Sequence, residues 1–410
     1  MFMRCTYLLC FFLPLLSACA YEKKHSVDGV NNDLASVLIE NNISIDVNDK
    51  GALNEADLAA FAKKIENVRI LALGEQTHGA GSVFSLKTDL IKYLHQNHDF
   101  DLFILESGMY DVREIMQQAK TGQSIKALAP GNIFYMYANS AEVTPLFDYV
   151  NDQLDSEKPL TMVGFDSQHT GGLSLTGLVS DLSEAQKLVD STWVEGADWQ
   201  LFSQQIQQVL DGTTERFSLA QEQLFFEQLN RLTLNFKRAD NGFWLRISHG
   251  LIAQAKRQWQ LGDNRSQQMG ENIKWWAEQY PDKKIIVWAH TWHLTKQGNE
   301  QINAGNVVHN TFGDEYYVVH FTGEQGKYLS YLDLTDKAVN QPQINSVEDT
   351  FIKHSNSPIN YLENKSLALE QYDMAVFAND YQATLPAKQW STYWDGMFIL
   401  EDITPATYQK

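Results

Sequence analysis

Ionisable side chains follow directly on four short apolar segments of this sequence. The segment from Ile70 to Leu73 leads into the stretch LGEQTHGAG, and the other three segments end in LFILES, MVGFD and IIVWAHTWH. Short aliphatic runs are typical of buried strands in a parallel sheet, and ligands of such sheets bind beyond the carboxyl ends of the strands. We therefore expect six residues to converge on one site: Glu75, His78, Glu106, Asp166, His290 and His293.

These residue types suggest proton transfer. A histidine held by carboxylates stays oriented and can remove a proton from water near neutral pH. Gly74 and Gly79 are expected to bracket a tight turn, through positive φ or close backbone approach, that aims Glu75 and His78 into the site. Other chemistries lack their motifs, because the sequence contains no complete Gly-x-Gly-x-x-Gly, Gly-x-Ser-x-Gly or His-Glu-x-x-His pattern.

The elements that would position these groups alternate between strand and helix. Apolar periodicity predicts helices at 55–65, 82–96, after Met109 and at 143–154, with strands at 68–73, 102–105, 161–165, 284–289, 316–321, 374–377 and 397–400. Such alternation favours an α/β fold with a mostly parallel sheet flanked by helices. Residues 173–262 show helical patterns only, so we interpret them as a helical insertion acting as a lid on a core formed by 51–172 and 263–410.

The first residues, MFMRCTYLLCFFLPLLSACA, join a positive charge to an apolar run and then small residues. This layout predicts a lipoprotein signal peptide at 1–18 with lipid attachment at Cys19; a plain signal peptide is the alternative. Residues 19–50 would form a tether and an N-terminal helix. We expect anchoring to the bacterial cell envelope through the lipid alone, with the outer membrane, facing the periplasm, favoured by Ala20.

Composition excludes several classes of protein. The three cysteines are Cys5, Cys10 and Cys19, so no thiol would remain for a disulfide, a zinc-thiolate site or a nucleophile. The net charge of −19 disfavours nucleic acid and anionic lipid headgroups as partners.

Several motifs occur together in a characteristic order: LGEQTHGAGSVFSLKTDLIKYL, FILESG, VGFD, RSQQMGENIKWW, VWAHTWHL and YWDGMFILEDITPAT. From about residue 55 to the end, the chain resembles the erythromycin esterase family. This resemblance implies an α/β fold with a helical insertion. It also implies hydrolysis of a small-molecule ester or lactone, and a contribution to antibiotic resistance if macrolides are the substrates.

The resemblance also implies roles for individual residues. The catalytic set would be His78, Glu75, Glu106, His290 and His293, with water attacking directly and no covalent intermediate. His290 or His293 would stabilise the oxyanion or protonate the leaving alkoxide. Substrate contacts would come from Lys87, Arg265 and Asp166. Two positions depart from the family pattern, since Lys87 replaces an arginine and Ser266 replaces an aspartate, and both departures weaken the case for macrolide specificity.

Two other functions fit the same residues. No cofactor is required by the water mechanism, but His78, His290, His293 and either glutamate could instead bind a divalent metal in a metal-dependent hydrolase. A lipoprotein that binds a haem-type ligand without catalysis is the second alternative. We interpret the isolated histidines as structural, and these are His169, His249 and His320.

Overall fold

A computed structural model describes residues 28–48, 52–212, 216–297, 302–344, 346–364, 376–378, 383–385 and 390–408. The predicted signal peptide and Cys19 lie outside the described residues. Within these ranges, no helix combines the length and the apolar character needed to cross a membrane.

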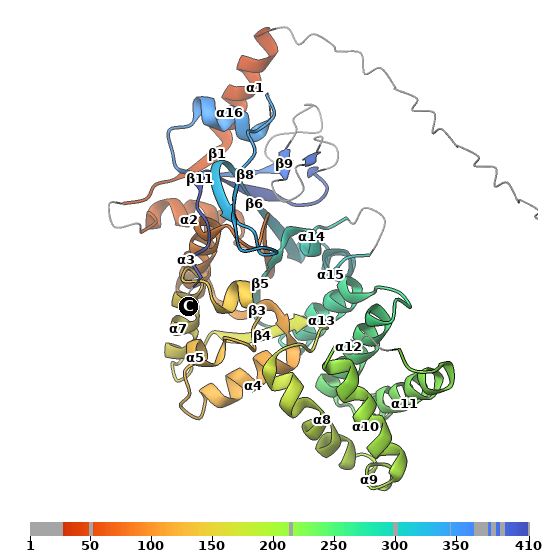
Figure 1. Ribbon diagram of the computed structural model, residues 1–410. Coiled ribbons are helices and arrows are strands. Elements are labelled where there is room, and N and C mark those ends of the chain that lie inside the picture. Colours follow the sequence, from red (N-terminus) through yellow and green to blue (C-terminus); the bar gives the residue numbers. More distant parts are fainter. Residues whose placement is uncertain are drawn as a thin grey trace, which may run out of the picture.

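A nine-stranded sheet forms the centre of the molecule, with the order β1-β8-β11-β6-β2-β5-β3-β4 and with β7 paired to β6 (Figure 1). The six strands from β11 to β4 in this order run parallel, whereas β8, β1 and β7 are each antiparallel to a neighbour. The strands are β1 Asn42–Ile45, β2 Ile70–Glu75, β3 Phe100–Gly108, β4 Thr161–Asp166, β5 Lys284–His290, β6 Tyr316–Leu329, β7 Asp336–Ala338, β8 Ile359–Glu363 and β11 Gly396–Ile403, with β9 Val376–Ala378 and β10 Ala383–Leu385 in a separate pair.

Helices cover both faces of this sheet because its central strands are apolar on both sides. In β2, Ile70 and Ala72 belong to one hydrophobic cluster, whereas Leu71 and Leu73 belong to the other. The helices are α1 Asp28–Asn41, α2 Glu55–Lys64, α3 Gly81–His98, α4 Met109–Ala119, α5 Ile125–Leu128, α6 Tyr135–Ala138, α7 Thr144–Asp152, α8 Gly172–Lys187, α9 Ser191–Val194, α10 Ala197–Leu210, α11 Leu219–Arg238, α12 Gly242–Gln258, α13 Arg265–Gln279, α14 Thr291–Leu294, α15 Ala304–Phe312 and α16 Val347–His354, with a 3-10 turn at Gly313–Glu315.

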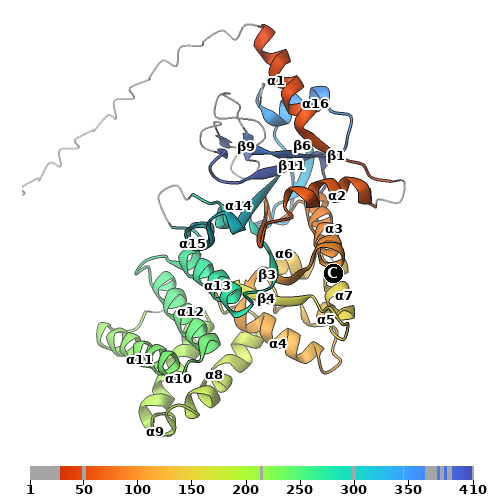
Figure 2. The ribbon, with the colours of Figure 1, turned by 180° about the vertical axis from the view of Figure 1, so that it is seen from behind.

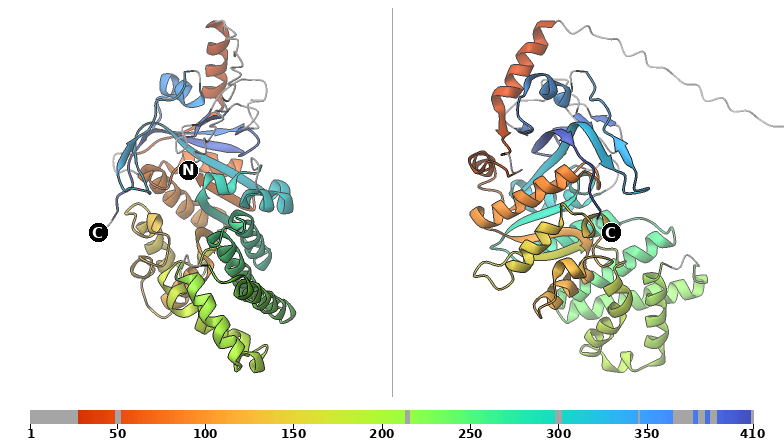
Figure 3. Two further views of the ribbon diagram at one scale, coloured as in Figure 1. Left: turned by 45° about the vertical axis from the view of Figure 1, so that its right-hand side comes forward. Right: turned by 60° about the vertical axis from the view of Figure 1, so that its left-hand side comes forward.

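The helices α8 to α12 form the predicted insertion, which lies beside the β4 edge of the sheet (Figure 2). Helix α8 contacts α4, while α12 packs on α13, which in turn contacts β4. The insertion extends away from the end of the molecule that carries α1 and α16 (Figure 3). Its aromatic residues pack mainly on one another, as Trp199 does against Phe202 and Trp193.

The predicted fold class, α/β with a mostly parallel sheet and a helical insertion, is confirmed. The antiparallel strands β1 and β8 and the short helices α5 and α6 were not anticipated. The predicted strand at 374–377 differs from the structure, because Met374 lies outside the described residues and β9 pairs with β10 rather than with the main sheet. Such short strands depend on distant partners more than on their own periodicity.

Candidate active site

The carboxyl ends of β2, β5, β3 and β4, which are consecutive in the sheet, bring the predicted site residues together. Glu75 and His290 are direct register partners in the pair β2–β5. Glu106 lies at the end of β3 and Asp166 ends β4. His78 follows β2, and His293 lies on the helix that follows β5. All eight predicted catalytic and substrate-binding residues therefore form one connected network of side chains.

Close backbone packing, rather than positive φ, explains the two glycines beside Glu75. A Cβ at Gly74 would lie 2.4 Å from Thr291 Oγ1 and 2.8 Å from Thr291 Cα. At Gly79 it would lie 1.6 Å from the carbonyl oxygen of Leu329. Neither glycine has a positive φ. The absence of a side chain thus lets α14 and β6 approach the turn that carries the site.

Glu75 lies at the bottom of the network and has no exposed side-chain surface. Its Oε2 accepts a short hydrogen bond from Lys87 Nζ, which is equally buried and lies 4.5 Å from the Trp288 ring centroid. Burial alone would raise the pKa of Glu75, but the charge of Lys87 and the hydrogen bond from His78 hold this pKa far below its usual value. Glu75 is therefore ionised in the folded protein near neutral pH.

Burial also acts on Lys87, whose pKa it lowers from 10.5 to about 8 against the opposing effect of Glu75. Lys87 was predicted to contact substrate, but the structure places its ammonium group beneath Glu75, away from solvent. This placement favours a role in holding the carboxylate.

His78 is oriented by Glu75. Its Nδ1 lies 3.1 Å from Glu75 Oε1, and because a carboxylate oxygen accepts hydrogen bonds only, the proton belongs on Nδ1. The lone pair of the neutral ring is then on Nε2. The His78 ring is tilted against His290, with centroids 5.1 Å apart, and meets Tyr331 edge-on at 5.2 Å.

Tyr137, on α6, joins the two glutamates and was missed by sequence analysis. Its hydroxyl group lies 2.7 Å from Glu75 Oε1, 3.2 Å from Glu106 Oε2 and 3.3 Å from His78 Nδ1. Burial and the two carboxylates raise the pKa of Tyr137 well above 10, so the hydroxyl keeps its proton. No strand precedes Tyr137 in the stretch FYMYANS, so the pattern that revealed the other residues could not reveal it.

Arg265 begins α13 and binds Asp166 through two hydrogen bonds, one of them from Nε to Oδ1 at 3.1 Å. Its Nη2 also lies 3.6 Å from Glu106 Oε1. Burial would lower the pKa of Arg265, but Asp166 outweighs this effect and raises it, so the guanidinium stays charged. A two-pronged pair of this kind fixes the guanidinium in position.

The two late histidines have different surroundings. The backbone N–H of His290 donates to Glu106 Oε2 at 2.8 Å. In its ring, Nε2 donates to the Gln76 carbonyl at 3.2 Å and Nδ1 accepts from the Trp292 N–H at 3.3 Å. Both ring nitrogens of His290 are thus engaged, which indicates that it positions its neighbours.

His293 contacts Glu106 through Nε2 at 3.5 Å, and its Nδ1 lies 3.1 Å from Ser266 Oγ. Burial, then the positive charge of Arg265 and the proximity of His290, lower the pKa of His293 to about 3. His293 is therefore neutral at physiological pH. Its ring can donate a hydrogen bond, but it carries no extra proton to transfer.

Exposure separates the network into two layers. The side chains that reach solvent are His78, Arg265 and His293, with 10%, 17% and 20% exposure. By contrast, Glu75, Lys87 and Asp166 are at 0% and Glu106 is at 2%. Contact of Lys87 or Asp166 with substrate would require the site to open, so their burial favours supporting roles.

Carboxyl groups outnumber cationic side chains in the network. The network contains three carboxyl groups but two cationic side chains, Lys87 and Arg265, so the acidic groups outnumber the basic ones by one. A proton on the imidazole of His78, whose side chain is 10% exposed, would balance these groups. Charges interact more strongly in a buried setting than in water, so this excess of carboxyl groups would favour the imidazolium that a general base becomes.

Of the histidines expected to be structural, two are deeply buried beside the site. His320 Nδ1 lies 2.8 Å from Thr291 Oγ1, and burial lowers the pKa of His320 to about 3. His169 lies under α12, where a Cβ at Gly250 would approach its Nε2 to 2.6 Å.

Replacing Tyr137 by phenylalanine tests its positioning role. The variant removes the hydroxyl group that lies between Glu75 and Glu106, so the two acids lose their shared donor. We expect kcat to fall about 10-fold to 100-fold, with a smaller change in KM, because the net value of such a bond is about 1.5–3 kcal/mol. Steady-state kinetics beside a melting curve would measure this, and an unchanged kcat would contradict it.

Three side chains of the site form a potential donor set for a metal ion. Glu75, His78 and Glu106 offer ligand atoms that all lie within 4.8 Å of one another. Among the described residues, this is the one group of three or more potential ligands with such spacing. Two carboxylates and one imidazole suit zinc or a similar ion. However, both oxygens of Glu75 already accept hydrogen bonds, one of them from the ammonium of Lys87. The fit is thus partial, and the late histidines predicted as ligands lie outside this group.

The chain is similar to known proteins both in sequence and in structure. YbfO of Bacillus subtilis (strain 168), which carries a hydrolase name, is 25% identical over 408 residues, covering 88% of this chain and 90% of YbfO. The crystal structure of a succinoglycan biosynthesis protein aligns with a TM-score of 0.77 at 16% identity, covering 94% of this chain and 100% of that chain. The erythromycin esterase EreC, solved as a mutant in its open conformation, aligns with a TM-score of 0.63 at 16% identity, covering 87% of this chain and 96% of the EreC chain.

The structural matches support the fold, and the family follows from the sequence. The sequence profile of the erythromycin esterase family matches residues 95–392. This range includes Glu106, Arg265, His290 and His293, whereas Glu75 and His78 precede it. The family and the name of YbfO indicate a hydrolase. Most of the chain is matched by the profile, and the protein therefore belongs to the erythromycin esterase family.

Proposed function

We propose that this hydrolase cleaves an ester or lactone with a water molecule activated by His78 and Glu75, without a covalent intermediate. The observation that carries the proposal is the contact of His78 Nδ1 with the buried, ionised Glu75 at 3.1 Å. It fixes the tautomer that leaves Nε2 able to accept a proton.

The reaction follows from this arrangement. His78 Nε2 removes a proton from water, and the resulting hydroxide attacks the carbonyl carbon of the substrate. The guanidinium of Arg265, with the neutral His293, would face the developing oxyanion. The carbon–oxygen bond to the leaving group then breaks, and the alkoxide takes its proton from the His78 imidazolium. Water supplies both the hydroxyl group of the acid product and the proton of the alcohol.

A substrate panel tests this function. The protein beginning at residue 20 would be incubated with simple aryl and alkyl esters, lactones that include macrolides, and matched amides. We expect turnover of at least one ester or lactone, with one oxygen from solvent appearing in the acid product in a single turnover in labelled water. Turnover of amides with no ester or lactone cleaved would overturn the assignment of the bond.

A divalent-metal hydrolase is a second candidate, favoured by the spacing of Glu75, His78 and Glu106. These residues would hold the ion, which would supply a bound water of lowered pKa. We expect that chelation leaves turnover unchanged, because Lys87 already compensates Glu75. Elemental analysis of the purified protein, with activity before and after EDTA, checks this. A stoichiometric ion whose removal abolishes turnover and whose return restores it would favour the metal mechanism.

The lipid anchor at Cys19 also remains a proposal, supported by the signal-like N-terminal sequence. It would hold the protein on the cell envelope, with the outer membrane facing the periplasm favoured. Fractionation of cells that express the wild type and Cys19→Ser would test it. We expect the wild type in the membrane fraction and the variant in the soluble fraction.

A further inference from the structure

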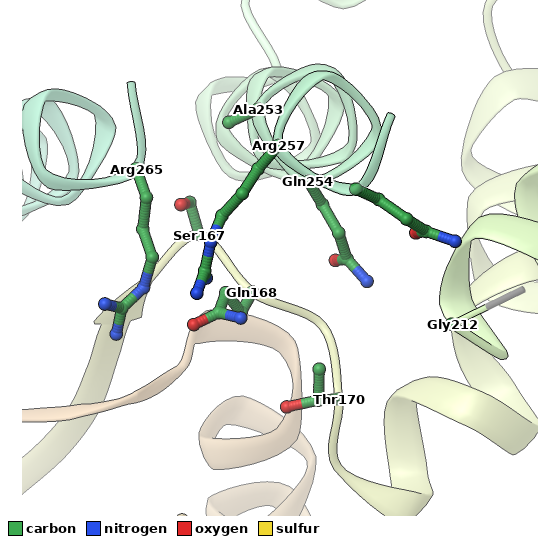
Figure 4. A pocket seen from close by; sticks show the side chains of 9 residues that line it. Ser167, Gln168, Thr170, Gly212, Ala253, Gln254, Arg257 and Arg265 are labelled. Atoms are coloured by element: carbon green, nitrogen blue, oxygen red, sulfur yellow. The ribbon is translucent and has the colours of Figure 1, made fainter. Parts of the chain in front are cut away.

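A pocket of about 200 Å³ lies next to the proposed catalytic network. Four parts of the chain form it: the loop after β4 with Ser167, Gln168 and Thr170, Gly212 after α10, helix α12 with Gln254 and Arg257, and the first residue of α13, Arg265. Figure 4 shows Arg257 and Gln254 extending from α12 toward this loop, with Arg265 on the other side of Ser167. The pocket thus lies where the helical insertion meets the core.

The lining of this pocket is suited to hydrogen-bond acceptors. Two guanidinium groups face it, together with hydroxyl and amide groups, and no described lining residue carries a carboxylate. This is unusual for a chain whose net charge is −19. Guanidinium groups carry five donors and no acceptor, and they match carboxylate and phosphate in geometry.

Two details show that these donors are available to a ligand. Ser167 is 2% exposed, and its Oγ has no hydrogen-bond partner among the described residues. A buried hydroxyl without a partner costs stability that a bound acceptor would recover. Among the described residues, Arg257 has one loose ion pair, with its Nε 3.7 Å from Asp263 Oδ2, and both side chains are about half exposed. Such a pair is worth little and yields to a better partner.

Arg265 joins the pocket to the proposed catalytic network. The same guanidinium that lines the pocket lies 3.6 Å from Glu106 Oε1 and is held by Asp166. Since Asp166 already neutralises Arg265, the additional positive charge of the pocket comes from Arg257. A substrate whose ester carbonyl lies near His78 and Arg265 could therefore extend a second group past Arg265 toward Arg257.

We propose that this pocket binds an anionic group of the substrate, a carboxylate or a phosphate, carried on the part of the molecule distant from the cleaved bond. Arg257 is the residue that determines this specificity. The proposal rests on the proposed ester hydrolysis for its catalytic consequence, but the binding of an anion does not depend on it. In volume, the pocket accommodates about seven water molecules at ~30 Å³ each, which is sufficient for a charged group with a few carbon atoms.

Ester hydrolysis provides the first test. We would compare kcat/KM for mono-4-nitrophenyl glutarate, which carries a carboxylate, with that for 4-nitrophenyl butyrate, which is neutral. The wild type should prefer the glutarate ester, and Arg257→Gln should lower this preference about 10-fold to 100-fold, the value of a charge-assisted hydrogen bond. Arg238→Gln is the matched control, because Arg238 is exposed on α11 and does not line the pocket. An equal preference in the wild type and Arg257→Gln would overturn the proposal.

Direct binding separates this inference from the proposed function. Calorimetric titration with glutarate and with inorganic phosphate at low salt should show binding to the wild type and to Arg238→Gln, and at least 10-fold weaker binding to Arg257→Gln. Binding of one anion alone would identify which source the pocket prefers. If anions bind in this pattern while no ester is cleaved, the proposal of an anion-binding pocket is supported and the proposed ester hydrolysis is contradicted. If esters are cleaved but neither anion binds, the pocket proposal fails alone.

Discussion

The His78→Ala variant is expected to hydrolyse any responsive ester about 10²-fold to 10⁴-fold more slowly than the wild type, the usual contribution of a general base. The physical reason is the loss of the imidazole that Glu75 orients through Nδ1 at 3.1 Å. The side chain is about one-tenth exposed at the mouth of the site, so its removal leaves the core in place. Steady-state kcat/KM, with the melting temperature as a check of folding, measures the effect.

A second histidine serves as the control for this variant. His249 lies on α12 among Arg246, Ile252 and Gln268, away from the catalytic network. We expect His249→Ala to keep kcat/KM within about 2-fold of the wild type. Equal turnover by His78→Ala and the wild type would remove His78 as the base, and an equal loss in both variants would point to a general effect on folding.

The Lys87→Met variant is expected to lower the free energy of unfolding by about 3–5 kcal/mol, because it leaves Glu75 as an unpaired charge in the core. Both side chains are fully buried and hydrogen-bonded to each other. Methionine matches the length of the lysine stem, so the effect should come mainly from charge. Urea unfolding measures the change, and Lys92→Met is the matched control because Lys92 lies on the same helix, α3, at a partly exposed position.

A double variant separates charge from packing in this prediction. Adding Glu75→Gln to Lys87→Met removes the unpaired charge, so most of the lost stability should return, while activity stays low because His78 no longer faces a carboxylate. A double-mutant cycle would give the coupling energy between the two side chains. Independent, additive effects of the two substitutions would contradict the buried pair.

Local sequence was sufficient to predict the part of the site that comes from strand ends. Glu75, Glu106, Asp166 and His290 each follow an apolar run directly, and parallel pairing then places these positions at one edge of the sheet. The same reasoning predicted the alternating core and the helical insertion.

The features that sequence did not predict depend on contacts between distant segments. Tyr137 reaches Glu75 from a four-residue helix, 62 positions along the chain, and nothing in its own neighbourhood indicates that contact. The family resemblance implied a substrate contact for Lys87, and nothing in the local sequence indicated that its partner would be Glu75. The strand β8 pairs with β1 across more than 300 residues, which a local pattern cannot encode.

The insertion and the core contribute different parts of the proposed site, and this difference bears on the evolution of the protein. Every charged group of the proposed catalytic network comes from the core elements, whereas α12 of the insertion supplies only a wall of the neighbouring pocket. Substitutions in this helical segment could therefore change which substrate is bound, while the catalytic residues of the core stay the same. A chimaera that grafts this segment from a relative would be expected to inherit the donor's substrate preference and retain the host's chemistry.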